Sequence, residues 1–172
     1  YFSNDLSAFS INTVTGALIP LNSVDPTVTV LGSNPFSVTV DTTGKYTYVA
    51  NYGTNDISAY SIELNGAEID QNGAAAGTTV AAGSNPRSVT LDPTGKFAYV
   101  ANWFSNDVSA YTIASTGVLT QIVCTGAATI CNGSNFKAKS APRSVTVDPS
   151  GKFAYVANSS SDDVSVYTIN AT

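Results

Sequence analysis

The chain has 172 residues, of which 43% are hydrophobic and only 11% are charged, and its formal net charge is −5. Its length allows a hydrophobic core. Because the charge is negative and no run of Lys or Arg occurs, neither nucleic acid nor an anionic membrane is expected as a partner. No segment approaches the roughly 20 consecutive apolar residues of a membrane-spanning helix, so membrane insertion is not expected either.

Four stretches of the chain repeat one another. The segment "NPRSVTLDPTGKFAYVANWFSNDVSAYTI" recurs with few changes, and "NDLSAFSI" near the start matches its last part; the stretches are residues 4–11, 34–62, 85–113 and 141–169. The three long copies are 51 and 56 residues apart, and the extra five residues fall between Thr116 and Ala141. Periods of this size indicate a repeat architecture.

Each full repeat predicts four short strands, A to D. "RSVTLD" alternates with Val89 and Leu91 on one face, and "DPTGK" is typical of a turn. "FAYVAN" and "DVSAYTI" are rich in aromatic and β-branched residues, and a fourth strand follows the "TG" turn as "GVLTQIV". No helical period occurs. The weakest fourth strand is expected in the Gly/Ala-rich stretch 66–82.

Antiparallel four-stranded units with this period are typical of β-propeller blades. We expect one all-β domain over residues 1–172, with about three blades plus one strand. The blades are predicted at 1–31 (strands C and D only), 32–82, 83–139 and 140–172 (strands A to C only). Because the chain opens in the middle of the pattern, it is expected to be a processed or incomplete piece. Further blades of a longer chain, or other copies of this chain, are then the expected partners.

The stretches "NPRSVTLDPTGKFAYVAN" and "APRSVTVDPSGKFAYVAN", each followed by "SNDVSAYTI" or a close variant, carry a family resemblance. They resemble the YVTN-repeat propellers, which belong with the lactonase-like β-propellers of the bacterial phosphogluconolactonase group. The resemblance extends over essentially the whole chain and implies a fold that usually closes seven blades.

Propeller geometry predicts where candidate binding residues lie. Strand B returns to the face that strand A leaves, so the D–A and B–C loops share one face. The predicted face holds Phe36, Arg87 and Arg143 near the axis, with Tyr52, Trp103, Phe104 and Ser159 further out. Asn51, Asn102 and Asn158 end the B strands beside them.

Two interpretations of this face remain open. Arg87 and Arg143 are suited to bind a carboxylate, phosphate or sugar acid, and Tyr52 and Trp103 to stack on a sugar. Alternatively, the arginines form ion pairs with neighbouring blades, and the asparagines cap turns. Tyr52-Gly53 and Ser159-Ser160 stand at the positions of Trp103–Phe104 in two sister repeats, so the blade itself does not require bulk there, and we expect both rings to be exposed on a contact surface.

The carboxylates give no strong signal for a metal. The Asp41, Asp92 and Asp148 turns lack the ladder of acidic residues of a calcium loop and the helix that follows a phosphate loop. Adjacent Asp162 and Asp163 allow a calcium role, but solvated turn residues explain them as well. Glu63, Glu68 and Asp70 are expected at the outer rim. No metal and no cofactor are predicted.

Cys124 and Cys131 stand close together, and no His or third Cys exists to complete a zinc site. A disulfide is the favoured interpretation, with two buried thiols as the alternative; closing a loop of roughly eight residues contributes about 2.5 kcal/mol in the chain-entropy model. A disulfide indicates an oxidising compartment. Three triplets also match glycosylation sites, at Asn132, Asn158 and Asn170.

The absence of His excludes Ser-His-Asp and Cys-His catalysis within this chain, and no catalytic residue is predicted. The favoured function is therefore a non-catalytic extracellular or cell-surface propeller for binding, adhesion or assembly, including assembly into a filament or envelope layer. One alternative is a fragment of a lactonase-like sugar-lactone hydrolase, for which Arg87 and Arg143 bind an anionic substrate. A second alternative is a carbohydrate-binding propeller.

Overall fold

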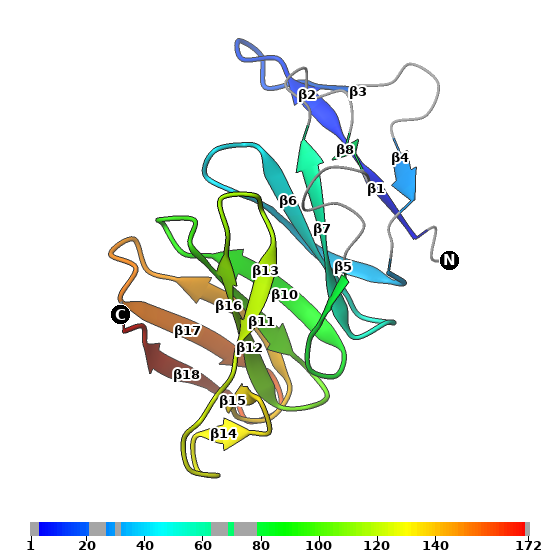
Figure 1. Ribbon diagram of the computed structural model, residues 1–172. Coiled ribbons are helices and arrows are strands. Elements are labelled where there is room, and N and C mark those ends of the chain that lie inside the picture. The colour runs from blue at the N-terminus through cyan, green and yellow to red at the C-terminus, as the bar shows by residue number, and fades with distance from the viewer. Residues whose placement is uncertain (1–3, 21–26, 30–31, 63–68, 71–78, 171–172) are drawn as a thin grey trace.

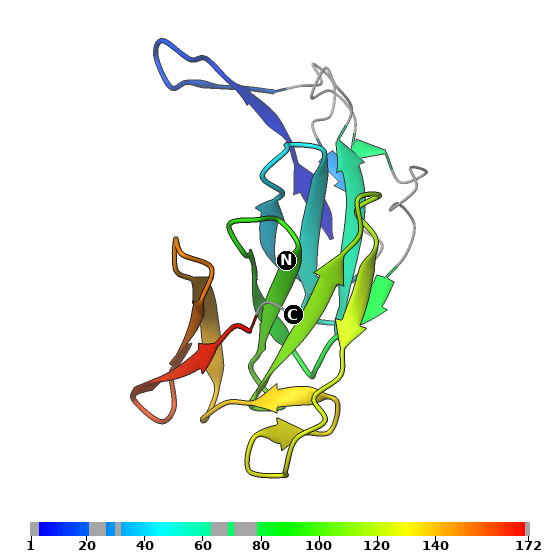
Figure 2. The same ribbon diagram turned by 60° about the vertical axis from the view of Figure 1, so that its left-hand side comes forward.

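The computed structural model describes residues 4–20, 27–29, 32–62, 69–70 and 79–170. Within these ranges the chain is all-β, with antiparallel pairing throughout, which confirms the predicted fold class. The described part contains no helix of the length and apolar character needed to cross a membrane. Figures 1 and 2 show successive sheets placed side by side in chain order.

The N-terminal strands form two small pairs. β1 (Asp5–Ser7) pairs with β4 (Thr27–Thr29), and β2 (Phe9–Ile11) pairs with β3 (Leu18–Pro20). Strand C of the repeat is thus interrupted at Ala8, and its partner strand D has two separate parts. The hairpin of β2 and β3 projects from the rest of the molecule (Figures 1 and 2).

The second blade is a sheet of three long strands and a divided fourth strand. β5 (Pro35–Val40), β6 (Tyr46–Asn51) and β7 (Asp56–Ile62) are neighbours in that order. β8 (Ile69–Asp70) pairs with the end of β7, and β9 (Thr79–Ala81) pairs with its start. The weak fourth-strand signal in the sequence therefore corresponds to two short strands.

The third blade repeats this plan and adds a hairpin. β10 (Pro86–Leu91), β11 (Phe97–Asn102) and β12 (Asp107–Ile113) lead to β13 (Leu119–Ile122), which pairs with the end of β12. The start of β12 pairs with β15 (Asn135–Lys137), which forms a hairpin with β14 (Cys131–Asn132). The five extra residues of the sequence lie in this addition.

The fourth blade has three described strands: β16 (Pro142–Val147), β17 (Phe153–Asn158) and β18 (Asp163–Thr168). The A strands β5, β10 and β16 lie next to one another, as expected for strands around a common axis. The register of each A–B pair shifts after its first residue, as between Pro86 and Ser88.

The core lies between blades. One cluster joins Tyr48, Ile57 and Ala59 of the second blade to Val89, Val100 and Tyr111 of the third. A second cluster joins Val108 of the third blade to Val145 and Val156 of the fourth. Burial of these apolar faces is the main favourable contribution to folding, so each blade depends on its neighbour.

The outermost faces remain open. β17 alternates between exposed and buried residues along its length, whereas β6 is buried on both faces over nearly its whole length. Val164 is 58% exposed, while Val108 at the same repeat position is 3% exposed. The difference arises because no described blade follows β18.

Candidate functional site

The B–C and D–A loops lie together in every full repeat. The amide of Tyr52 donates to the carbonyl of Asn34 at 2.9 Å, that of Trp103 to Asn85 at 3.0 Å, and that of Ser159 to Ala141 at 2.9 Å. Asn34, Asn85 and Ala141 all have positive φ. These bonds place the loops on one face, beside the first residues of the A strands.

Four side chains from two blades converge on this face, and we call them the Arg87 cluster: Arg87, Phe36, Tyr52 and Trp103. The guanidinium Cζ lies 5.0 Å from the centre of the Phe36 ring, 5.3 Å from Tyr52 and 4.5 Å from Trp103. The rings also contact one another, with centroids 5.8 Å apart for Phe36–Tyr52 and 6.5 Å for Tyr52–Trp103. The three distances from the guanidinium to the rings are within the range of cation–π attraction, so the rings hold the guanidinium in place.

The Arg87 guanidinium is held in one orientation, and no described residue neutralises its charge. Its Nε is buried and has no hydrogen-bond partner, and no described residue forms a hydrogen bond or ion pair with the terminal nitrogens. Arg87 as a whole is half-buried, and its terminal nitrogens are not among the buried atoms that lack a partner in the described part of the chain. The ion pair of the alternative interpretation is therefore not found among the described residues. A rigid guanidinium without an ion pair to any described residue is suited to bind an oxyanion.

Trp103 and Phe104 behave differently from each other. Phe104 is 69% exposed, as expected. The ring of Trp103 is partly buried, and its Nε1 is covered without a partner, because the ring packs on Arg87 and Tyr52. Only Phe104 thus meets the expectation of an exposed ring, and the Trp103–Phe104 contact, with centroids 6.3 Å apart, extends the cluster outward.

Arg143 does not join the cluster. It is exposed and lines a shallow hollow with Ser159, Asp162 and Asp163. Ser159 stands where Trp103 stands in the third blade, and no ring in the described part of the chain lies against the Arg143 guanidinium. The two arginines share a repeat position but not an environment.

The asparagines that end the B strands are structural. Asn102 Nδ2 donates to Asp107 Oδ1 at 2.7 Å and to Ser109 Oγ at 2.9 Å, and Asn51 and Asn158 make the same pair of bonds in their blades. All three Oδ1 atoms are buried without a partner. The turn-capping interpretation therefore describes these residues, and none of them presents its amide to a ligand.

The surroundings of Asn158 contradict its predicted glycosylation. It is 3% exposed, and its Nδ2, the atom that would carry the glycan, donates two hydrogen bonds within its blade. Asn132 and Asn170 are exposed, although Asn132 Nδ2 is also engaged, at 2.8 Å from the Ser105 carbonyl oxygen and 2.9 Å from Asp107 Oδ2. Glycosylation at these two positions stays a prediction.

The aspartate carboxylates of the A–B turns accept hydrogen bonds from backbone amides of the same turn. Asp92 accepts hydrogen bonds from the amides of Thr94, Lys96 and Phe97, and Asp41 and Asp148 do the same in their repeats. The Ser150 hydroxyl and backbone amides hold the pKa of Asp148 below its usual value. Burial alone would raise the pKa of Asp41, but hydrogen bonds from Thr43 and the turn amides outweigh it and lower the pKa.

No group of three or more potential metal ligands occurs among the described residues. Asp162, with φ of 54°, occupies the same loop position as Asn55 and Asn106, which also have positive φ. This position is a turn in all three long repeats. Glu63 and Glu68 lie outside the described residues, and for Asp70 the structure gives backbone pairing only.

A disulfide joins Cys124 to Cys131, with Cα atoms 5.7 Å apart. It closes the loop before the β14–β15 hairpin. Sequence reasoning placed both cysteines in the insertion but missed the contact of that hairpin with the B–C loop. The sequence did contain one signal for this contact, because the inserted residues and the pair Trp103–Phe104 occur in the same blade.

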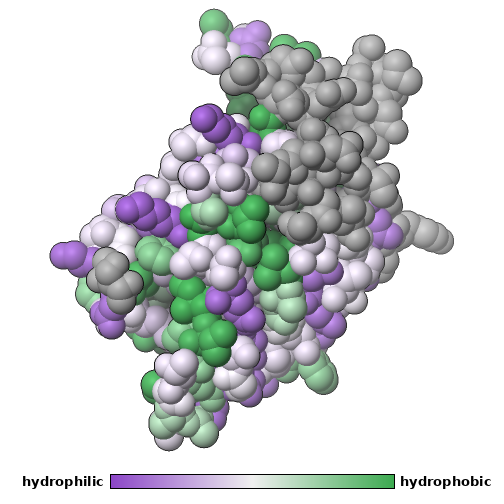
Figure 3. All heavy atoms as spheres, in the orientation of Figure 1, coloured by the Kyte–Doolittle hydropathy of each residue, from purple (hydrophilic) through white to green (hydrophobic). Residues whose placement is uncertain are grey.

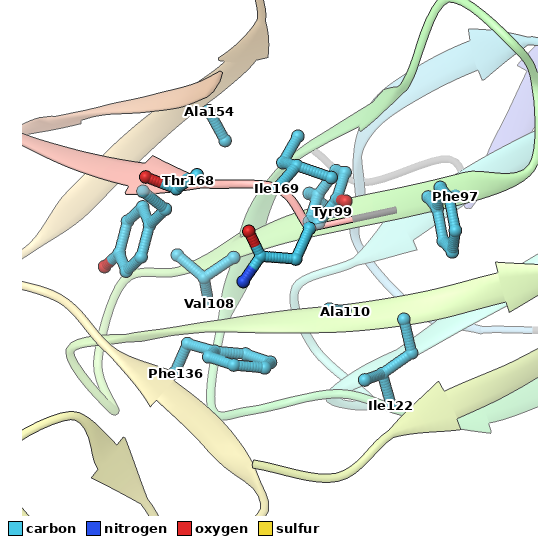
Figure 4. Close-up of a pocket in the computed structure, with 11 residues that line it drawn as sticks. Phe97, Tyr99, Val108, Ala110, Ile122, Phe136, Ala154, Thr168 and Ile169 are labelled. Atoms are coloured by element: carbon cyan, nitrogen blue, oxygen red, sulfur yellow. The ribbon is translucent and has the colours of Figure 1, made fainter. Parts of the chain in front are cut away.

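An apolar hollow lies away from the Arg87 cluster, between the third and fourth blades (Figure 4). It measures about 240 Å³, and its lining includes Phe97, Tyr99, Phe136, Ala154 and Ile169. Burial, with a smaller contribution from Asp92, raises the pKa of the Tyr99 hydroxyl to about 12, so this group stays neutral at physiological pH. The lining offers no group suited to acid–base chemistry.

The hollow has a structural origin. Between the second and third blades, Leu119 of β13 fills the corresponding space as part of the core. The fourth blade has no described fourth strand to supply such a residue. Figure 3 shows that apolar surface also gathers over β12 and β13 on the outside. We therefore interpret the hollow as a packing site for a strand and not as the reactive centre.

Fold and site together define a set of β-propeller blades whose loop face carries the Arg87 cluster. The sequence matches the family described as "Lactonase, 7-bladed beta-propeller" over residues 3–74 and 67–132. The chain therefore belongs to the lactonase family of seven-bladed β-propellers, in agreement with the resemblance noted in its repeats.

Solved structures support the same fold. A candidate 6-phosphogluconolactonase of Bacteroides fragilis has a TM-score of 0.77 at 20% identity, covering 97% of this chain and 45% of its own. One from Bacteroides uniformis has a TM-score of 0.75 at 21% identity, and the match covers 97% of this chain and 48% of the other. The periplasmic gluconolactonase PpgL of Pseudomonas aeruginosa has a TM-score of 0.67 at 17% identity, covering 96% and 50%. The chain thus spans about half the length of these proteins. Comparison with curated proteins gives no significant match.

These findings correct the favoured function. The expectation of a non-catalytic adhesion or assembly module is wrong, because the matching family is one of lactonases and the similar structures carry lactonase names. The absence of His excludes particular catalytic groups within these residues, but it does not exclude hydrolysis of an activated ester.

Proposed function

We propose that this chain contributes to the hydrolysis of lactones of anionic sugar acids, and that Arg87 binds the anionic group of the substrate. The observation that carries the proposal is the half-buried Arg87 guanidinium, which three rings hold in place and which forms no ion pair with any described residue. Membership of the lactonase family supports it, as do the 6-phosphogluconolactonase names of similar structures.

The chemistry needs few protein groups. Water adds to the lactone carbonyl, the ring C–O bond breaks, and the ring oxygen takes up a proton, which gives the open hydroxy acid. Arg87 would hold a phosphate or carboxylate of the substrate through its two terminal nitrogens, so that the carbonyl is placed reproducibly. Its positive charge also favours the negative charge that develops on the carbonyl oxygen. Hydrogen bonds hold the pKa values of Asp41 and Asp148 below their usual value, and neither residue is assigned as a general base.

An oxidising compartment suits this proposal. The disulfide between Cys124 and Cys131 is of a kind that persists in secreted or periplasmic proteins, and one similar structure is named a periplasmic gluconolactonase. We therefore place the chain outside the cytoplasm as part of the proposal. Mass analysis of the chain isolated from its native source would test whether the disulfide forms there, since a disulfide lowers the mass by two hydrogens.

The test is a comparison of two lactones. Hydrolysis of 6-phosphogluconolactone and of glucono-δ-lactone is followed by acid release, with spontaneous hydrolysis subtracted. Arg87→Ala is expected to lower kcat/KM for the phosphorylated lactone by about 10- to 100-fold, as expected for loss of one charge-assisted contact, and to affect the neutral lactone much less.

Lys152→Ala is the matched control, because Lys152 is an exposed cation in the A–B turn of the fourth blade. It should leave both rates unchanged. Absence of hydrolysis above the spontaneous rate contradicts the proposed reaction. Equal losses for both lactones in Arg87→Ala contradict the assigned role of Arg87.

A further inference from the structure

The two main departures from the repeat pattern occur in the same blade and contact each other. Among the three long repeats, that of the third blade alone has a bulky pair, Trp103–Phe104, in its B–C loop, and it alone has the insertion with Cys124, Cys131 and Asn132. The connection is direct: Asn132 Nδ2 lies 2.8 Å from the carbonyl oxygen of Ser105 and 2.9 Å from Asp107 Oδ2. The loop that presents Trp103 to Arg87 is therefore bonded to the inserted hairpin.

The B–C loop is held from two sides. On one side, the D–A loop binds it through Phe104 N to Ser84 O at 3.1 Å and Ser84 N to Ser105 Oγ at 2.9 Å. The other full repeats have equivalent backbone bonds, as from Ser160 N to Ser140 O. On the other side is Asn132, and among the described residues this side-chain contact has no counterpart in the second or fourth blade.

Asn132 is itself fixed by its surroundings. It pairs with Asn135 at the tip of the β14–β15 hairpin, and Asn135 bonds Asp107 and Ser109 of β12. Below the tip, Cys124 N donates to Ser134 O at 2.9 Å, and the disulfide ties Cys124 to Cys131, the residue before Asn132. Movement of the hairpin away from β12 would therefore remove both Asn132 contacts to the loop.

We propose that Asn132 is a positioning residue for the Arg87 cluster, and that the Cys124–Cys131 disulfide holds it in place. Asn132 fixes the B–C loop, the loop fixes the Trp103 ring, and the ring fixes the guanidinium 4.5 Å away. Release of the loop lets the ring turn from Arg87, and the guanidinium loses its closest aromatic contact. This inference rests on the proposed anion-binding role of Arg87 only for its effect on affinity; its effect on Trp103 is independent of that role.

Trp103 is the only tryptophan of the chain, so its fluorescence reports this site alone. The variants are Asn132→Ala, Asn132→Asp, which keeps the shape but removes both donors, and the double variant Cys124→Ser/Cys131→Ser. Thr129→Ala is the matched control, an exposed residue of the same loop. Emission spectra and titrations with inorganic phosphate are recorded for each folded protein, with circular dichroism to verify the fold.

We expect a red shift of Trp103 emission in all three variants and not in Thr129→Ala. The Kd for phosphate should rise by about five-fold or more, the lower end of typical coupling between sites. Asn132→Asp should be affected at least as strongly as Asn132→Ala, because its carboxylate would face that of Asp107.

Folded variants with unchanged emission and unchanged Kd contradict the inference, even where their melting temperature falls, because that pattern indicates support of the fold alone. If the wild-type chain binds phosphate and the variants shift as expected, but no lactone is hydrolysed, the inference holds and the proposed reaction fails. If the wild-type chain binds no phosphate, the emission spectra still decide whether Asn132 positions Trp103.

Discussion

At the scale of single residues, the same amino acid at the same repeat position takes different roles. Arg87 is enclosed by three rings, whereas Arg143 lies open beside Ser159. The asparagines show the reverse, since Asn51, Asn102 and Asn158 keep one pair of hydrogen bonds in three blades. A repeated residue whose partners also repeat is structural, and a repeated residue whose neighbours vary is a candidate for function.

Asn102→Asp tests the structural role of these asparagines. The substitution keeps the shape but replaces two donors with a carboxylate that faces Asp107 in a buried site. We expect the free energy of unfolding to fall by about 3 kcal/mol, as for a broken buried polar pair, measured by urea denaturation. Asn12→Asp is the control, because Asn12 Oδ1 only accepts bonds from Val14 and Thr15. Equal losses in the two variants would show that the buried network contributes little.

The candidate site was predictable from sequence only up to its general position. Strand alternation places Phe36 and Arg87 at the start of A strands and Tyr52 and Trp103 after B strands, and the structure finds them on one face. The enclosure of Arg87 was not predictable, because it depends on how far one blade is rotated against the next. The partial burial of Trp103 follows from that same enclosure.

At the scale of elements, the C–D hairpin is where blades are connected. Gly117 has φ of +79°, and its Cβ position lies 2.4 Å from the ring of Tyr46 in the preceding blade. The hydroxyl of Tyr48 donates to the Gly117 carbonyl at 3.1 Å. The sequence indicated a turn at this Gly, but not that a neighbouring blade packs on it, since the turn signal is local and the contact spans 69 residues.

Comparison of Gly117→Ala with Gly16→Ala separates the cost of the left-handed backbone conformation from the cost of the contact with Tyr46. Gly16 occupies the equivalent turn with φ of +74°, but nothing lies within 4 Å of its Cβ position. Gly16→Ala should therefore lower the free energy of unfolding by about 1–2 kcal/mol, because only the left-handed backbone conformation is unfavourable for Ala. Gly117→Ala adds displacement of the Tyr46 ring, and we expect about 2 kcal/mol more, in the range of overpacking. Thermal unfolding of both variants measures the difference, and the same melting temperature for both would exclude a role of the contact.

At the scale of the whole molecule, the repeat explains both the stability and the open surfaces. Each inner blade uses one face against the blade before it and the other against the blade after it. The period of the repeat made this stacking predictable. The divided fourth strands were not predictable, because β8, β9 and β15 are too short to leave a pattern and pair only because β7 and β12 offer a free edge.

The open faces should control the association of this chain. Val164 and Val166 of β18 are each 58% exposed, and Val38 and Val40 of β5 are 51% and 52% exposed. Apolar surface of this kind is typical of an interface, and the internal interfaces show what it fits, namely a blade of the same repeat. We therefore expect the 172-residue chain to self-associate with rising concentration, as measured by sedimentation velocity.

Val166→Asp should reduce this association without unfolding the chain, because a charge is tolerated on an exposed face. Ala110 occupies the same repeat position in the third blade, where it is 3% exposed and lines the hollow that the fourth blade covers. Ala110→Asp should therefore destabilise the fold, since a buried unpaired carboxylate typically costs several kcal/mol. If both variants lose stability equally, the face of β18 is already covered within the chain. If Val166→Asp sediments like the unmodified chain at every concentration, association does not use that face.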